Sequence, residues 1–327
     1  MRTLSCYKSG RAGKLEFGGV GLGGALYWQD VIGRELQKVI ASELGAALVL
    51  NPYCGGRDNR DPVRYDVSSD GFDIAYLELF DTPSRRPADF VWSMISDYIG
   101  MEKEMEGFLA SVKPNLLISL QYPLNPPEAI PHLPQLGKLP NLSEQCVAHG
   151  CKVVLLPWFN TQNRTEYNPN KMIPGMCTGR MGSTYPFRNA AWMFLQKLNR
   201  PDVILSGNPT GSTFSLSDED YRRCLGLTKY YFTGGIYDLQ IPPKVYEVMN
   251  YGACLVCHDM PMMEASGLIP GETYLPIESV EEIPAILERD DWKEIAPKGQ
   301  AMVHERHSLQ ARARDFVRVY REITGNG

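Results

Sequence analysis

Short apolar runs alternate with segments of helical periodicity along most of this chain, and this alternation constrains the fold more than any other feature. The strand-like runs lie at residues 2–7, 46–50, 72–80, 115–120, 152–156, 176–180, 202–206, 229–233, 252–257 and 273–277. The helical patterns lie at 25–44, 88–112, 141–149, 187–198, 217–226, 243–250, 260–266, 279–288 and 291–323, the last broken near His307. Because strands that alternate with helices form parallel sheets covered by helices, we predict an α/β protein.

A polar segment rich in Asn and Pro, residues 158–175, interrupts this alternation and is typical of an interdomain linker. The length of 327 residues also fits two domains. We therefore predict a Rossmann-like domain over 1–165 and a second over 166–327, with the last helix able to cross back to the first. In such folds ligands bind beyond the carboxyl ends of the strands, so two domains of this kind would face a central cleft.

Composition excludes several other classes. The net charge of −5 offers nucleic acid and anionic membranes no general attraction. The chain lacks both an apolar run long enough to span a membrane and a secretory leader, which favours a cytoplasmic protein without a membrane span. Cys254 and Cys257 have CxxC spacing but lie in an apolar run without a second such pair, so we interpret them as core residues rather than as a reactive or zinc-binding pair.

Seven glycines precede the first long helical pattern, and Gly19, Gly21 and Gly24 satisfy GxGxxG. Glycines at a helix N-terminus let backbone N–H groups approach an anion such as phosphate, which makes Gly21, Gly23 and Gly24 candidate ligand-binding residues. A nicotinamide dinucleotide site is the alternative, although the glycines stand some distance from the first strand and the second strand ends at Asn51. Glycines that serve only close packing are a third interpretation.

The most informative segment, residues 241–287, reads IPPKVYEVMNYGACLVCHDMPMMEASGLIPGETYLPIESVEEIPAIL. Its features are a Pro-led helix with Lys-x-x-Glu, a small pair before an apolar strand, an acidic turn, a Pro-Gly-Glu turn, and later a Gly and a His in the closing helices. The residues concerned are Pro242, Pro243, Lys244, Glu247, Gly252, Ala253, Asp259, Pro270, Gly271, Glu272, Gly299 and His307. This pattern resembles the C-terminal domain of GT-B glycosyltransferases, in particular the spore-maturation type.

Local chemistry agrees with the resemblance. Lys244 and Glu247 stand at i and i+3 and share a face near a helix N-terminus, where a cation and free N–H groups could offset a diphosphate. The resemblance implies that Glu247 accepts the ribose hydroxyls of a nucleotide sugar. It also implies that Arg180 and the segment Thr233, Gly234 and Gly235 contact the diphosphate and the base. A solvent-exposed Lys244–Glu247 ion pair and a surface ion pair of Arg180 are the structural alternatives.

The expected activity is therefore transfer of a sugar from a nucleotide-sugar donor, such as a UDP-sugar, to a hydroxyl acceptor, with no cofactor and no metal. Asp81 and, second, Glu16 are the candidates for the catalytic base. Many retaining relatives have a carboxylate eight positions before the ribose-binding one, but this chain has Leu239 there, with Asp238 beside it. The stereochemical outcome therefore stays open. Among the five histidines, His258 is the one that follows a strand facing the cleft.

The acceptor could be a glycan, a small metabolite or a modified base in phage DNA. A DNA acceptor would need a basic groove, for which the candidates are Arg57, Arg60, Arg64, Arg85 and Arg86. Two other functions stay open: an NAD-dependent oxidoreductase that uses the Gly19–Gly24 loop, and a non-catalytic sugar- or nucleic-acid-binding protein on the same fold.

Overall fold

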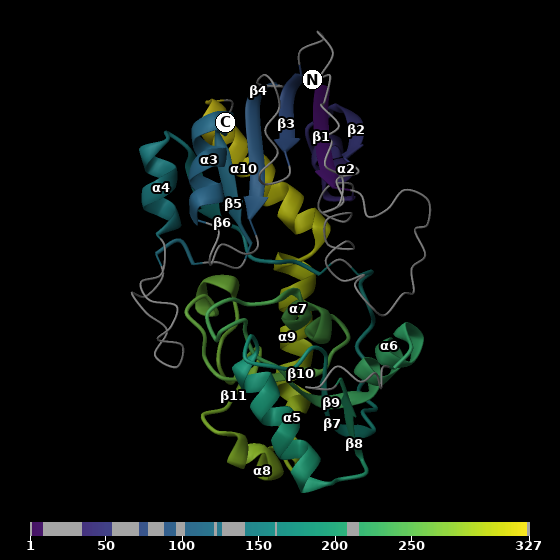
Figure 1. Cartoon of the computed structure of the whole chain (residues 1–327). Coiled ribbons are helices and arrows are strands. Elements are labelled where there is room, and N and C mark those ends of the chain that lie inside the picture. The colour runs from purple at the N-terminus through teal and green to yellow at the C-terminus, as the bar shows by residue number, and fades with distance from the viewer. Residues whose placement is uncertain are drawn as a thin grey trace. The chain divides into compact units, whose positions relative to one another are not determined.

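The computed structural model describes residues 2–8, 35–53, 72–77, 88–95, 102–120, 123–125, 141–160, 162–207 and 216–325. They form two compact units (Figure 1). Unit 1 takes its described residues from 1–129, 136–156 and 309–327, and unit 2 takes its described residues from 157–308. The chain thus leaves unit 1 after Leu156 and returns to it at Leu309.

Unit 1 contains a sheet of six parallel strands in the order β2-β1-β3-β4-β5-β6. The strands are β1 (Arg2–Lys8), β2 (Ala47–Tyr53), β3 (Phe72–Leu77), β4 (Ala88–Ile95), β5 (Leu116–Ser119) and β6 (Lys152–Leu155). The chain runs from β1 to one neighbour, β2, and then crosses to the other, β3. This reversal of strand order is the point at which doubly wound sheets bind ligands.

The prediction of a helical pattern across 88–112 is wrong for its first part, because residues 88–95 form β4. This strand lies between β3 and β5 and is buried on both faces, with only Asp89 exposed. A strand covered on both faces reads as a continuous apolar run and lacks the polar alternation that identifies a strand. The helix α3 is confined to Glu102–Val112.

The other described helices of unit 1 are α2 (Gln37–Glu43), α4 (Leu142–Ala148) and α10 (Leu309–Thr324). The last helix of the chain closes the core of this unit. The ring of Phe316 lies 4.2 Å from that of Trp92 on β4, and Tyr320 meets Phe90 edge-on at 4.9 Å. Because Trp92 and Phe316 are fully buried, α10 is an integral part of unit 1.

Unit 2 contains five parallel strands in the order β11-β10-β9-β7-β8. These strands are β7 (Ile173–Thr178), β8 (Val203–Ser206), β9 (Thr228–Phe232), β10 (Cys254–Cys257) and β11 (Leu275–Pro276). The helices are α5 (Pro186–Leu198), α6 (Asp218–Leu227), α7 (Pro243–Asn250), α8 (Ile283–Leu287) and α9 (Trp292–Arg306), with 3₁₀ turns η3 (Glu264–Ser266) and η4 (Val280–Glu282). The elements predicted in this half are confirmed to within a few residues, except that 260–266 is a turn with the 3₁₀ helix η3.

Residues that the sequence analysis assigned to a linker are packed into unit 2 instead. Trp158 and Phe159 are buried, and the Asn160 N–H donates to the His307 carbonyl over 2.6 Å. The buried His307 ring also contacts the Trp158 carbonyl through Nδ1 at 3.1 Å and stacks on Tyr246 at 4.2 Å. The His of the family pattern therefore ties this segment to α7.

Gly299 of the same pattern has a packing role as well. A Cβ at this position in α9 would lie 2.5 Å from the Thr273 carbonyl oxygen and 2.8 Å from Met249 Cε. Only a glycine lets α9 approach this closely. Cys254 and Cys257 are free and buried in β10, as expected for core residues. Among the described residues, no helix combines the length and apolar composition needed to cross a bilayer.

Candidate functional site

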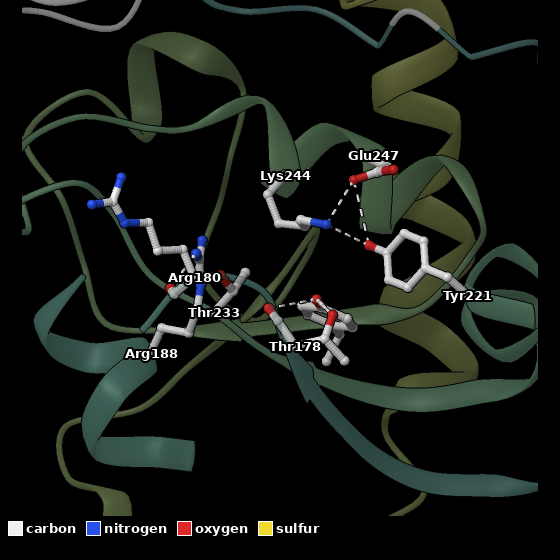
Figure 2. A network of polar contacts seen from close by, with 8 residues as sticks. Thr178, Arg180, Arg188, Tyr221, Thr233, Lys244 and Glu247 are labelled. Carbon is white, nitrogen blue, oxygen red and sulfur yellow. Dashed lines mark hydrogen bonds and ion pairs between the residues drawn. The ribbon is translucent and has the colours of Figure 1, made fainter. Parts of the chain in front are cut away.

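The candidate site lies in unit 2, where the strand order reverses between β7 and β9. The crossover from β7 leads to β8 on one side, while β9 lies on the other, so the loops that follow β7 and β9 diverge. A pair of contacts at this position joins the two strands: the Tyr231 hydroxyl lies 2.7 Å from Thr178 Oγ1 and donates to the Thr178 carbonyl over 3.2 Å. Side chains from the following loops and from α5, α6 and α7 surround this position (Figure 2).

Helix α7 presents Lys244 and Glu247. Pro243 occupies its first turn, where proline suits the helix because no N–H is needed there. Val245, Tyr246, Val248, Met249 and Asn250 are all buried. The side chains of Lys244 and Glu247 keep 24% and 18% of their surface exposed and form an ion pair with Nζ and Oε2 3.1 Å apart. The helix is therefore packed on every side except the one that carries this pair.

Tyr221 of α6 contacts both members of this ion pair, and the sequence analysis did not predict it. Lys244 Nζ donates to the Tyr221 hydroxyl over 2.7 Å and lies 4.4 Å from the centre of its ring. The hydroxyl in turn donates to Glu247 Oε2 over 3.4 Å (Figure 2). The three side chains form one triangle, and a tyrosine in an amphipathic helix gives no sequence signal that would predict this.

The electrostatics fix the protonation of the triangle. Burial raises the pKa of Tyr221 well above its usual range, and the Glu247 carboxylate raises it further, so the phenol keeps its proton. Burial alone would lower the pKa of Lys244, and Arg188 also lowers it. The Glu247 carboxylate and Tyr231 together outweigh both effects, so that the pKa of Lys244 lies above its ordinary value and the amine is charged at neutral pH.

Arg188 is the second residue that the sequence analysis missed. It stands in the first turn of α5, two residues after Pro186, and only 3% of its surface is exposed. Its Nε donates to Thr233 Oγ1 over 2.8 Å and its Nη1 to the Arg180 carbonyl over 3.2 Å, while the guanidinium lies 4.1 Å from the Tyr185 ring centre. The sequence contained one feature that could have identified it: an arginine shortly after the end of a predicted strand, in the loop–helix segment that follows β7.

No carboxylate of the described residues lies within ion-pair distance of Arg188. A buried cation is costly unless an anion compensates it. Arg188 also acts on Lys244 electrostatically, as its effect on the lysine pKa shows. Arg188, Lys244 and the exposed Arg180 place three cations at these strand ends, against the carboxylates of Glu247 and Asp238, and this excess of positive charge suits an anionic ligand.

The loop after β9 holds Thr233, Gly234 and Gly235 close to its neighbours. A Cβ on Gly234 would lie 2.9 Å from Phe187 Cβ, and one on Gly235 would lie 2.7 Å from the Gln240 carbonyl oxygen. Both glycines are thus required for packing, and Thr233 is fully buried against Arg188. Contact of these residues with a ligand stays a prediction.

Of the remaining predicted residues, some lie in the described part of the chain and the others lie outside it. Arg180 is exposed, and among the described residues its guanidinium has no ion-pair partner, so the surface ion pair considered above is not formed there. Leu239 is buried. Several predicted residues lie outside the described part of the chain: Glu16, Gly21, Gly23, Gly24, Arg57, Arg60, Arg64, Asp81, Arg85 and Arg86. The described residues contain no group of three or more His, Cys, Asp or Glu side chains placed to hold a metal ion.

Residues 190–318 match the sequence model of a family described as glycosyl transferase-like. A search of curated protein sequences gave no match. Among solved structures, a glycosyltransferase from Rickettsia africae is similar with a TM-score of 0.57 and 12% identity, over 100% of this chain and 99% of that chain.

Two further solved structures are similar over their full length. HepE of Anabaena, solved in complex with UDP and glucose, gives a TM-score of 0.52 at 11% identity, over 98% of this chain and 100% of that one. Sucrose-phosphate synthase of Thermosynechococcus elongatus gives 0.50 at 10% identity, over 100% of both chains. The chain has the GT-B fold, and the predicted resemblance is confirmed at this level. The narrower likeness to the spore-maturation type stays a prediction.

Proposed function

We propose that this chain is a glycosyltransferase that moves a sugar from a nucleotide-sugar donor to a hydroxyl acceptor. The GT-B fold and the glycosyl transferase-like match over 190–318 support this activity. The observation that carries the proposal is the buried Arg188 at the strand ends of unit 2, which has no carboxylate partner among the described residues and acts electrostatically on Lys244. A diphosphate supplies the negative charge that this arrangement lacks.

The donor would bind with its diphosphate between Arg188 and Lys244. Arg180, exposed at the end of β7, is the third cation within the same loop region. Glu247 would accept hydrogen bonds from the ribose hydroxyls, since its carboxylate is directed outward from α7 and is held by Lys244 and Tyr221. Thr233, Gly234 and Gly235 would approach the base or the diphosphate through their backbone.

Transfer requires that the acceptor oxygen bonds to the anomeric carbon while the bond from this carbon to the diphosphate oxygen breaks. Negative charge then develops on the leaving diphosphate, where fixed cations stabilise it most. We propose that arginine and lysine provide this stabilisation without a metal. Asp81 and Glu16 stay the proposed candidates for the base that takes the acceptor proton. A glycan, a small metabolite and a modified DNA base stay the proposed acceptors.

A thermal-shift screen tests the proposal, with UDP, GDP, ADP and dTDP as ligands, each with and without MgCl₂. A ligand at one hundred times its dissociation constant should stabilise the protein by about 2.7 kcal/mol. Arg188→Met should lose this stabilisation, because hydrogen bonds to a charged group contribute about 1.5–3 kcal/mol each. His149→Gln, a change in the exposed His149–Glu106 pair of unit 1, is the control that should keep it.

Turnover is the second readout. Glu247→Ala should abolish the release of nucleoside diphosphate from the donor while the protein keeps its fold, as judged by circular dichroism. Full turnover by Glu247→Ala, or a wild-type protein that binds none of the four nucleotides, would contradict the proposal. Nucleotide binding without any release of nucleoside diphosphate would instead indicate a binding protein on this fold.

A further inference from the structure

A second pair of polar side chains lies beside the cationic site. His258 directly follows β10, and its Nε2 lies 3.0 Å from Oδ1 of Asp238, which belongs to the loop between β9 and α7. The imidazole keeps 24% of its surface exposed and the carboxylate 15%. The pair is therefore largely enclosed but still reachable from solvent.

Two contacts place His258 against the chain neighbours of Arg188 and Thr233. The imidazole ring packs against Phe187 with 5.2 Å between ring centres, and its Cε1 would lie 3.2 Å from a Cβ on Gly234. Phe187 and Gly234 are the chain neighbours of Arg188 and Thr233, which are hydrogen-bonded to each other. His258 thus contacts the sequence neighbours of Arg188 and Thr233, the two residues whose hydrogen bond holds the buried guanidinium.

The loop that carries Asp238 has an unusual backbone. Tyr237 and Asp238 have φ angles of +51° and +55°, a region that residues other than glycine seldom adopt. The Tyr237 N–H donates to the Thr184 carbonyl over 2.8 Å, and an isolated bridge joins Ile236 to Gln240. Such backbone conformations persist where surrounding contacts enforce them, and here they hold the Asp238 carboxylate against the imidazole.

The position of the Asp238 carboxylate determines which ring nitrogen of His258 can accept a hydrogen bond. The Asp238 carboxylate lies within ion-pair distance of Nε2 but is not aligned for a hydrogen bond to it, so its negative charge, rather than a hydrogen bond, favours the form in which Nε2 carries the proton. In the neutral ring Nδ1 is then an acceptor. Within the part of the chain that the structure describes, no hydrogen bond to Nδ1 is formed. An enclosed acceptor of this kind suits a ligand that donates an O–H group.

We propose that His258, oriented by Asp238, accepts a hydrogen bond from a hydroxyl group of the donor sugar and so determines which sugar the site takes. The inference rests on the proposed function, because a diphosphate at Arg188 brings its attached sugar next to Phe187 and Gly234. His258 contacts the sugar, while Asp238 is a positioning residue. Removal of this acceptor should weaken binding of the nucleotide sugar and leave binding of the free nucleoside diphosphate unchanged.

Three variants separate these roles by calorimetry. His258→Gln keeps an amide near the Nε2 position but lacks an acceptor at Nδ1, whereas His258→Asn places its amide near Nδ1. His149→Gln is the control, because His149 forms a comparable imidazole–carboxylate pair in unit 1, with Nε2 2.7 Å from Glu106 Oε1. The probes are the matched pairs UDP and UDP-glucose, GDP and GDP-mannose, and ADP and ADP-glucose.

His258→Gln should weaken binding of the nucleotide sugar by roughly 3- to 10-fold, the effect of one neutral hydrogen bond, and leave the diphosphate within twofold of wild type. His258→Asn should restore most of the affinity. An equal loss for both members of a probe pair, or no loss for either, would overturn the inference and leave the proposed function intact. A wild-type protein that binds no nucleoside diphosphate would refute both.

The free protein provides an independent readout. Long-range ¹⁵N–¹H spectra at pH 7.5 should show His258 as the tautomer with its proton on Nε2, and Asp238→Asn should shift the tautomer balance. A proton on Nδ1 in the wild-type protein would overturn the inference, because Nδ1 could then not accept from a hydroxyl.

Discussion

Replacing Gly299 by alanine tests how closely α9 must approach its neighbours in unit 2. The added Cβ would lie 2.5 Å from the Thr273 carbonyl oxygen and 2.8 Å from Met249 Cε. The methionine methyl group can move, but the carbonyl belongs to the backbone of a turn whose Thr273 is itself buried. Accommodation of the methyl group therefore requires a displacement of α9 or of this turn.

Two effects of opposite sign determine how much Gly299→Ala changes the free energy of unfolding. Alanine in a helix interior is favoured over glycine by about 1 kcal/mol. Overpacking of a close-packed interior costs about 1–3 kcal/mol, and a backbone clash belongs to the upper part of this range. We expect the free energy of unfolding of Gly299→Ala to fall by about 1–2 kcal/mol.

The matched control is Gly226→Ala in α6, because a Cβ at Gly226 would have no atom within 4 Å. This variant should gain about 0.5–1 kcal/mol. Urea unfolding followed by fluorescence measures both changes, and hydrogen exchange of β9 and β10 assigns them to unit 2. A Gly299→Ala protein as stable as the wild type would refute the close approach of α9 described here.

Three other substitutions test separate parts of the molecule. Tyr221→Phe keeps the ring but removes the hydroxyl that contacts both Lys244 and Glu247, and nucleotide affinity measured by calorimetry should fall by about 3- to 10-fold while the fold is retained. Phe316→Ala should destabilise unit 1 by about 3–5 kcal/mol in urea unfolding, because the buried ring packs on Trp92. Burial lowers the pKa of Lys171 from its ordinary 10.5 to about 8, so in that interval the unfolded chain holds a proton that the folded chain has released. The free energy of unfolding should therefore rise with pH from 8 to 10.5, and urea titrations of Lys171→Met should lack this part of the rise. Nucleotide affinity unchanged in Tyr221→Phe, a loss below 1 kcal/mol in Phe316→Ala, or an unaltered pH slope in Lys171→Met would contradict the respective argument.

The sequence predicted local structure where local signals are strong. Helix α7 was predicted at 243–250 and is found there, because a proline begins it, its apolar residues share one period and Gly252 follows it. The strand β4 was missed because burial on both faces removes the alternation that reveals a strand. The order of the strands depends on contacts between distant segments, which no local pattern contains.

The same distinction applies to the site. Lys244 and Glu247 were predicted as a pair because three residues of helix place them on one face. Arg188 and Tyr221 come from other helices and reach the site only through the strand order of unit 2. Asp238 and His258 were each noted in the sequence, but the loop conformation that brings them together has no sequence signature.

The return of α10 to unit 1 has a consequence for synthesis on the ribosome. Phe316 and Tyr320, which close the core over Trp92 and Phe90, are translated after every strand of both sheets. The part of the chain that emerges first therefore acquires its full core last, whereas unit 2 is complete once residue 308 has left the exit tunnel. Until α10 is translated, Phe90 and Trp92 of the sheet in unit 1 lack the aromatic side chains that cover them. Exposed apolar surface of this kind is what chaperones shield.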